Sequence, residues 1–504
     1  MNRRLAWELC LLCVCLTLTG CVSGGVTPTA AVTLPPAVNT RQAPENDAEQ
    51  SYERDVLLYV PSLDGTQLLA VPQTALLSAA RPAAQALCEL LLAYPGGEDT
   101  APVGGDVALS LSGTDAVEVS GQVATVSLSA SALRLTHEQM FTVGQALANT
   151  LCQTDGVQYV NVLVAGTQPG LNVAATLPAG SFQPNTWEEL AALWARASGP
   201  SASGRRSFAA TLYFPAPSGK GILCEGRTLA FADPDLPGMA ATLLGALSSG
   251  AEQVPNVPRC PDLKGLLQSD ITLEESGGSR RIALHFQEGL NSALIEAGIT
   301  RSVMTASLVY TLTTFLPGID GVEITVGEEK ITSLTPSGTY LGAGETVSFP
   351  DGVMRRRDFV SFLLAECALY FADAQGNLTR VYRPVPFYQA YSARALLEQM
   401  MLGPQPFDSR TGLFSPLPRD LRSADLLGVA LDGHTLLLNF SARLPGLCAG
   451  LSPEEERRMV YALVDTVCQL PAVKKAALFV QGGQPDTLAG ALYLPGDFLP
   501  DPEM

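Results

Sequence analysis

Short apolar strands with tyrosine as the next-to-last residue recur three times along the chain. Residues 56–60 read VLLYV, residues 210–214 read ATLYF and residues 367–371 read CALYF. A turn with Gly, Asp or Asn and a second extended run follow each of them, a pattern typical of β-hairpins. The sequence therefore predicts three equivalent hairpins. Their matching tyrosines are Tyr59, Tyr213 and Tyr370.

Two helices are expected in each of these units. The first follows the hairpin, begins near proline and ends at glycine or proline, which is the usual asymmetry of helix ends. The second carries apolar residues at steps of four, which places them on one face that packs on a sheet. The first helices are predicted at Ala83–Tyr94, Met239–Leu247 and Ala393–Leu402. The apolar faces of the second helices comprise Val143, Leu147 and Leu151, then Met304, Leu308 and Leu312, then Met459, Leu463 and Val467.

Three further strands complete each unit. Two of them flank a tight turn between the helices, and the third follows the second helix with the alternation of a strand that buries one face. This third strand is expected at residues 157–164, 319–326 and 473–480. Because the same order occurs three times, we predict an α/β (α+β) fold of three tandem repeats. Each repeat would pack two helices on one face of a small mixed β-sheet.

The repeats and the composition between them divide the chain into domains. Residues rich in Pro, Thr, Ala and Val before the first hairpin are typical of a flexible tether, and a Ser- and Gly-rich stretch separates the first two repeats. A short helix is expected between these two repeats at Trp187–Ala197, and the second junction is apolar enough to be partly packed. The predicted order is a signal peptide (1–20), a tether (21–51), domain 1 (52–182), a linker (183–207), domain 2 (208–340), a connector (341–364), domain 3 (365–498) and a tail (499–504).

The N-terminal segment predicts export from the cytoplasm. Two arginines precede an apolar run at residues 9–18, which is too short to span a bilayer and has the length of a signal peptide's hydrophobic region. The following Leu-Thr-Gly-Cys at residues 18–21 resembles the bacterial lipobox, which implies cleavage before Cys21 and a lipid on that cysteine. We expect the protein on the extracytoplasmic face of the cell membrane. The alternative is an ordinary secreted protein with a cysteine near its cleavage point.

Charge argues against nucleic acid as a partner. The chain has 504 residues and a formal net charge of -18, whereas binding to phosphates needs clustered lysine and arginine. Arg355, Arg356 and Arg357 form its only basic cluster.

Cysteine and histidine do not form a pattern that indicates catalysis or metal binding. Seven of the eleven cysteines lie beyond Cys21; they are scattered and odd in number, so we expect at least one free or intermolecular thiol and mostly small apolar core residues. Only three histidines occur, and they fall in different parts of their repeats: His137, His285 and His434. Neither a metal-ligand spacing nor a nucleophile motif accompanies them. No catalytic residue, cofactor or metal site is therefore expected.

Two other polar motifs have structural explanations. Glu454, Glu455 and Glu456 follow Ser452 and Pro453, so an N-cap, a first-turn proline and acids near the helix dipole account for them. The Ser-Gly-Lys-Gly run at residues 218–221 lacks the spacing of a phosphate-binding loop, and its position favours a hairpin turn.

In their order, three features resemble the GerM domain of bacterial sporulation and germination lipoproteins. They are the strand with its tyrosine, the helix ended by proline, and the second helix with Thr-Leu or Thr-Val followed by a strand of alternating apolar residues. The resemblance covers roughly residues 55–182, 208–333 and 365–498. The family commonly has an aspartate after the valine of the outgoing strand, and this chain departs from that with Ser127, His285 and Asn439. Family members with one or two such domains are usual, so a third is a further departure.

The resemblance implies an envelope-side assembly module, related in shape to ring-building domains of transenvelope complexes, and the family is not known as an enzyme. We therefore expect a non-catalytic, lipid-anchored scaffold or adaptor in spore formation or germination. Its partners would be envelope or sporulation proteins, in a homo- or hetero-oligomeric assembly, with the membrane bound through Cys21.

Two alternatives stay open at this point. One is a lipoprotein that binds peptidoglycan or modifies the cell wall; glycan hydrolysis needs two carboxylates about 5 to 10 Å apart, and glycan binding commonly uses exposed aromatic side chains. The chain has only three tryptophans, one of them in the expected signal peptide, which argues mildly against both activities. The other alternative is a sensor lipoprotein that regulates a membrane kinase.

Overall fold

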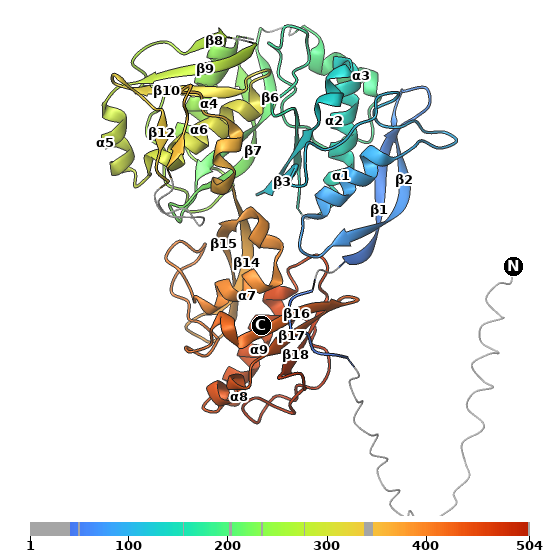
Figure 1. The fold of residues 1–504 in the computed structure, drawn as a ribbon, viewed down its shortest axis with the longest axis vertical. Helices are drawn as coiled ribbons and strands as arrows, with labels where there is room; N and C mark the ends of the chain where they lie inside the picture. The colour runs from blue at the N-terminus through green and yellow to red at the C-terminus, as the bar shows by residue number, and fades with distance from the viewer. Residues whose placement is uncertain are drawn as a thin grey trace, which may run out of the picture. The chain divides into compact units, whose positions relative to one another are not determined.

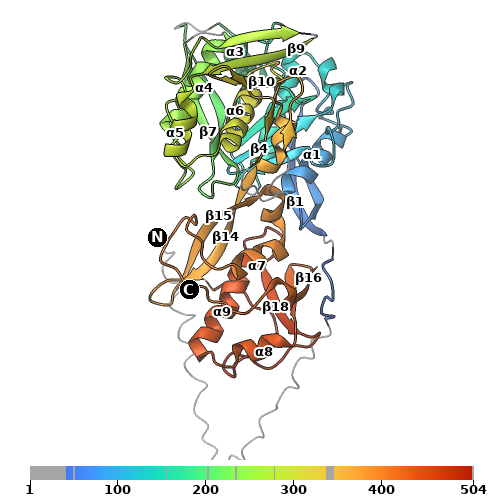
Figure 2. The same ribbon diagram turned by 60° about the vertical axis from the view of Figure 1, so that its left-hand side comes forward.

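The same succession of strands and helices occurs three times along the chain (Figure 1 and Figure 2). The structure is a computed structural model that describes residues 41–48, 51–154, 156–200, 204–232, 235–276, 278–336 and 346–501. The signal peptide expected at 1–20 and Cys21 lie outside the described residues. From Gln42 onward the chain forms one compact unit.

Strand pairing divides each repeat into a hairpin and a separate mixed sheet. The middle strand of the mixed sheet pairs antiparallel with the strand before it and parallel with the strand after the second helix. A parallel pair needs a crossover connection, which the second helix provides. The predicted α/β class and the three repeats are confirmed.

The elements of the repeats correspond one to one. The first repeat contains β1 Ser51–Pro61, β2 Leu68–Ser78, α1 Ala83–Ala93, β3 Val117–Ser120, β4 Val123–Leu128, α2 His137–Leu151 and β5 Tyr159–Val164. The second contains β6 Arg206–Pro215, β7 Ile222–Phe231, α4 Leu236–Ser249, β8 Thr272–Ser276, β9 Ser279–Phe286, α6 Arg301–Phe315 and β10 Gly321–Val326. The third contains β14 Leu364–Ala372, β15 Leu378–Pro386, α7 Ala393–Met401, β16 Leu426–Asp432, β17 Thr435–Phe440, α9 Pro453–Val467 and β18 Lys475–Val480.

Shorter elements fill the connections. The helices among them are α3 Leu190–Ser198, α5 Gly289–Glu296 and α8 Arg443–Cys448, with the 3-10 helices η1 Ala130–Arg134, η2 Arg356–Phe362, η3 Phe387–Tyr391 and η4 Ser423–Asp425. The strands are β11 Glu329–Lys330, β12 Ser333–Leu334 and β13 Val347–Ser348.

Several element ends differ from the predicted ones. Helix α4 begins before the expected Met239, because the Asp235 side chain accepts a hydrogen bond from the N–H of Gly238 and caps an earlier first turn. The final strands begin two residues later than expected. Val157, Ile319 and Val473 are buried as predicted, but they lie in the turn before the strand.

The second helix of each repeat packs on both sheets of that repeat. Helix α2 contacts β1 and β5, α6 contacts β6 and β10, and α9 contacts β14 and β18. The predicted apolar faces are buried; Val143, Leu147 and Leu151 have no exposed surface. The core of each repeat therefore lies along its second helix.

A threonine near the end of the second helix makes the same hydrogen bond in every repeat. Its hydroxyl oxygen accepts from the backbone N–H of the hairpin tyrosine, on the strand edge that the other hairpin strand does not pair. The N···O distances are 3.0 Å for Tyr59 and Thr150, 3.0 Å for Tyr213 and Thr311, and 3.2 Å for Tyr370 and Thr466. This contact satisfies a donor that water cannot reach easily and confirms that the three tyrosines are equivalent.

The expected linker at residues 183–207 contains ordered structure. The helix expected at Trp187–Ala197 forms as α3, and the ring of Trp194 lies 5.6 Å from that of Phe141 in α2. Trp187 precedes this helix and is 87% exposed. Strand β6 begins inside the predicted linker, at Arg206.

The flexible tether expected at residues 21–51 is wrong for residues 43–48, which pack on the third repeat. Ala43 is buried with Leu437, Ala477 and Phe479, which lie on the side of the mixed sheet that the helices do not cover. That side is apolar in this repeat, and covering it removes an exposed hydrophobic patch. Composition alone predicted no structure here.

Polar contacts fix the same segment in register. The Asn439 side chain donates to the Pro44 carbonyl at 2.8 Å, and Arg394 forms an ion pair with Asp47. Asp47 also accepts from the N–H of Val429 at 3.0 Å. Only glycine fits beneath the segment at position 428, where a Cβ would lie 2.7 Å from the Pro44 carbonyl oxygen.

Candidate functional site

One buried arginine joins the repeats. Arg356 lies in η2, within the connector expected at residues 341–364, and its guanidinium forms an ion pair with Glu118 of β3. It also donates to Thr314 at 2.5 Å and lies over the ring of Tyr310 in the second repeat, 3.9 Å from the ring centroid. The residue is only 9% exposed. The connector is therefore packed between repeats, as its apolar composition indicated.

Residues of all three repeats are hydrogen-bonded to one another next to this arginine. The Ser120 hydroxyl at the end of β3 donates to the Leu364 carbonyl at the start of β14, at 2.5 Å. The Ser120 carbonyl in turn accepts from the Cys224 thiol of β7. Gly121 has a φ of 55°, and a Cβ there would collide with the Cys224 carbonyl, so the turn requires glycine. All three repeats meet at this point.

A buried polar network joins the first repeat to the second. The Asn161 side chain in β5 donates to the hydroxyls of Thr211 in β6 and Thr125 in β4, at 2.9 and 3.2 Å. The Ser181 hydroxyl donates to the Asn161 amide oxygen at 2.7 Å. These side chains lie on the face of the mixed sheet that α1 and α2 do not cover. The second repeat therefore covers this face of the first repeat's mixed sheet. Residues 43–48 cover the equivalent face in the third repeat.

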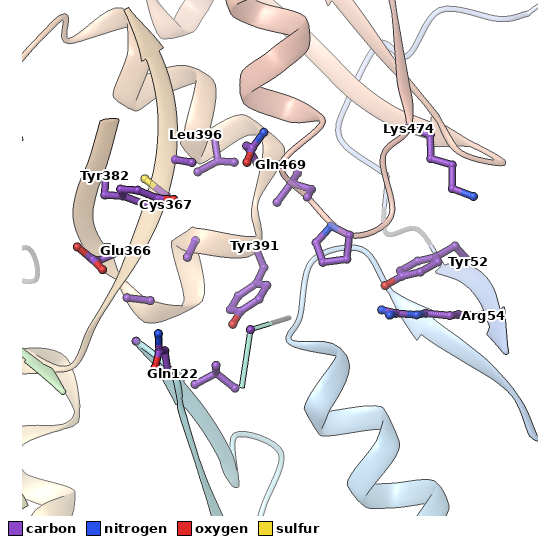
Figure 3. Close-up of a pocket in the computed structure, with 18 of the residues that line it drawn as sticks. Tyr52, Arg54, Gln122, Glu366, Cys367, Tyr382, Tyr391, Leu396, Gln469 and Lys474 are labelled. Atoms are coloured by element: carbon purple, nitrogen blue, oxygen red, sulfur yellow. The ribbon is translucent and has the colours of Figure 1, made fainter. Parts of the chain in front are cut away.

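A cavity with a volume of about 1080 Å³ lies between the first and third repeats. Figure 3 shows Glu366, Cys367 and Tyr382 on one side of it and Tyr52 and Arg54 on the other. Three tyrosines contribute to its wall: Tyr52, Tyr382 and Tyr391. The cavity is lined by strands of two equivalent hairpins, β1 and β14–β15, and by turns of the mixed sheets at Gly121 and His434. It is the candidate binding site of this protein.

The structure keeps the three histidines apart. His137 is the first residue of α2, His285 lies in β9 and His434 follows β16. Only His434 borders the cavity, where its Nδ1 lies 3.0 Å from the Ala472 carbonyl oxygen and its ring lies 6.1 Å from that of Tyr52. Among the described residues, no hydrogen bond joins the side chain of one of these histidines to a Ser or Cys side chain.

The seven described cysteines are free thiols, and five of them are buried. Burial raises the pKa of Cys367, which borders the cavity, to about 12, and that of Cys224 likewise to about 12. A thiol with such a pKa carries little thiolate at neutral pH and is a weak nucleophile. The interpretation of most of these cysteines as core residues is confirmed.

The explanation of the three consecutive glutamates was incomplete. Ser452 and Glu455 form the expected capping box at the start of α9. Glu456 differs, because it is fully buried and its carboxylate accepts hydrogen bonds from four backbone N–H groups in residues 488–492. This carboxylate holds the C-terminal loop on α9.

The sequence interpretation also missed Arg356 as a junction residue. Its neighbourhood carried a signal: Phe359 and Phe362 follow at steps of three, and both are buried. Two short 3-10 turns meet at Phe359, and the three side chains are buried along them. A basic run beside such a turn is a candidate for a buried cation.

Two kinds of feature are absent from the described residues. In this part of the chain, no group of three or more His, Cys, Asp or Glu side chains could hold a metal ion. No helix within the same residues has the length and apolarity needed to cross a membrane.

Solved structures similar to this chain come from a sporulation protein and from a protein titled "Putative Lipoprotein". The tandem GerMN domains of the sporulation protein GerM from Bacillus subtilis are 14% identical, cover 59% of this chain and 99% of that chain, and have a TM-score of 0.21. The first GerMN domain of the same protein is 20% identical, covers 27% of this chain and 97% of that chain, and also has a TM-score of 0.21. A "Putative Lipoprotein" from Clostridium perfringens is 18% identical, covers 27% of this chain and 87% of that chain, and has a TM-score of 0.19. Comparison with curated proteins finds no match.

The family described as Germane, sporulation and spore germination, matches residues 57–169, 211–332 and 368–486, one segment in each repeat. These segments make up more than half of the chain. The chain therefore belongs to the Germane family of sporulation and spore germination, whose domain it contains three times.

Proposed function

We propose that this protein is a non-catalytic, lipid-anchored scaffold or adaptor on the extracytoplasmic face of the cell membrane, acting in spore formation or germination. The observation that carries the proposal is that buried charged side chains bind other parts of the same chain. Arg356 and Glu118 join repeats to one another, and Glu456 holds a loop. In an enzyme, buried charged side chains such as these would surround the substrate.

The cavity supports the same proposal. Its bordering thiol has a raised pKa, and its one histidine is hydrogen-bonded to backbone. General acid–base or nucleophilic catalysis would need a base within hydrogen-bond reach of its partner. A cavity of strand edges and tyrosines is better suited to holding a partner protein. Family membership supports the link to sporulation and germination.

The lipid anchor can be tested through Cys21, with Cys15→Ser as a matched control in the same segment. We expect the wild-type and Cys15→Ser chains to sediment with membranes after a high-salt wash and to restore spore formation and germination in a strain without the gene. We expect Cys21→Ser to be soluble or unprocessed and to restore neither. A Cys21→Ser chain that remains on membranes would contradict the anchor, and normal sporulation and germination without the gene would contradict the proposed role.

A further inference from the structure

The outward edges of β1 and β14 are only partly occupied. On β1 the outward backbone groups are those of alternate residues, and Leu57 and Tyr59 use them to bond the side chains of Gln153 and Thr150. On β14, Leu364 bonds Ser120 and Tyr370 bonds Thr466 in the same way. The alternation of an antiparallel ladder therefore identifies which residues of each strand point outward.

By this alternation four more residues point their backbone N–H and C=O outward: Glu53 and Asp55 on β1, and Glu366 and Ala368 on β14. Within the described part of the chain, these groups have no hydrogen-bond partner. All four residues line the cavity between the first and third repeats. An unpaired strand edge is a template for an added strand.

The second repeat shows the equivalent edge in use. Ala209 lies four residues before Tyr213, as Asp55 and Glu366 lie four residues before their own tyrosines. The Ala209 carbonyl accepts from the N–H of Ser181 at 2.7 Å. The next residue of that extended segment, Phe182, pairs with Val160 of β5. An extended piece of chain thus already donates a backbone hydrogen bond to this edge position in one repeat.

The side chains at the open edges favour a basic occupant. Position 209 is alanine where the edge is paired, whereas the open edges carry Asp55 and Glu366, with Glu53 nearby. Among the described residues, none of these three carboxylates forms an ion pair. Burial raises the pKa of Glu366, so a cation placed beside it would relieve the cost of keeping it charged. Of the cations that line the cavity, Arg54 and Lys474 lie on the far side from Glu366 (Figure 3), and the Arg380 guanidinium lies over the ring of Tyr382.

We propose that the cavity binds an extended, lysine- or arginine-bearing segment of a partner protein, which adds a strand to the edge of β14 at Glu366 and Ala368. This inference rests on the proposed function, because it names the surface and the partner chemistry of a protein that acts by contact. The backbone pairing gives affinity, and a basic side chain facing Glu366 gives preference. Tyr382 and Tyr391 contribute apolar wall around the bound segment.

The probes are short acetylated and amidated peptides in which valine and threonine alternate with lysine. A second peptide carries glutamate in place of lysine, and a third carries lysine with N-methyl groups on alternate backbone nitrogens. Fluorescence anisotropy measures their binding to the full-length chain in mild detergent. We expect the lysine peptide to bind and the other two not to bind.

Protein variants test the location. Glu366→Gln should weaken binding of the lysine peptide about fivefold, while Glu296→Gln, an exposed glutamate of the second repeat, should leave it unchanged. Ala368→Pro should abolish binding, because it removes an N–H that the hairpin itself does not use. Equal binding of the lysine and N-methylated peptides, or no binding of any peptide to the wild-type chain, would overturn the proposal.

The outcomes also separate this inference from the proposed function. If the chain restores sporulation but binds no peptide, the strand-addition proposal is wrong and the proposed scaffold role stands. If the chain binds the lysine peptide through Glu366 but cells without the gene sporulate and germinate normally, the binding site stands and the proposed function is wrong.

Discussion

Replacing Arg356 by leucine is expected to destabilise the protein by about 3–5 kcal/mol, the usual cost of removing one partner of a buried ion pair. The substitution leaves Glu118 without its cation in a site where its side chain is only 15% exposed. It also removes the hydrogen bond to Thr314 and the contact with the face of Tyr310. Because these partners belong to the first and second repeats, the loss should also loosen the junction between repeats.

The neighbouring Arg357 provides a matched control. Its side chain is 78% exposed, so Arg357→Ala should change stability by no more than about 0.5 kcal/mol. Arg356→Lys should fall between the two, since lysine keeps the charge but not the planar fork that bonds several acceptors. Urea unfolding followed by circular dichroism measures all three. Equal midpoints for Arg356→Leu and Arg357→Ala would show that the junction does not depend on this arginine.

Glu456→Gln is the second substitution with a large expected effect, about 2–4 kcal/mol, because an amide presents one acceptor oxygen to four N–H donors and leaves at least two of them unsatisfied. Both carboxylate oxygens are used, with distances of 2.8 to 3.1 Å to the nitrogens of residues 488–492. Glu454→Gln removes the same charge two residues earlier, at an exposed position, and should cost far less. Similar midpoints of urea unfolding for these two variants would contradict the role given to Glu456.

The same residue should shape the pH dependence of stability. Burial alone disfavours its charged form, but the four N–H donors outweigh burial and lower its pKa from the ordinary 4.5. A lowered pKa means that its stabilisation is present above about pH 4.5 and is lost as the pH falls through the folded-state value. In the Glu456→Gln variant this acidic loss should be smaller.

Asp465, in the same helix, has the opposite effect on the pH dependence of stability. Burial raises its pKa to about 6, and the nearby Asp501 carboxylate adds to the effect although the N–H of Asp501 opposes it. The folded state therefore takes up this proton more readily than the unfolded state does. Its contribution to stability should rise as the pH falls from about 7 towards 4. Urea unfolding across this range, with Asp465→Asn as comparison, measures the contribution.

Much of the fold follows from local pattern. Steps of four on the second helices and the alternation of the strands after them depend only on neighbouring residues. They identified Leu151, Leu312 and Val467 as equivalent buried positions, and all three are fully buried. The tyrosine and threonine alignments are confirmed by one hydrogen bond that occurs three times.

The missed features depend on contacts between distant parts of the chain. Residues 43–48 have the composition of a linker and pack only because Leu437, Ala477 and Phe479 form an apolar face far away in the sequence. Arg356 is one of three consecutive arginines, and its ion-pair partner Glu118 lies in another repeat. The phenylalanines after Arg356 indicate a buried turn, but no local pattern indicates which distant residue pairs with it.

The most direct test of the central claim, that this protein acts by contact and not by catalysis, is complementation by a chain that carries His137→Gln, His285→Gln and His434→Gln together. The proposal predicts spore counts and germination equal to those of the wild-type chain, apart from a modest loss of stability. Loss of function from a triple variant that is normally folded and normally abundant would contradict it.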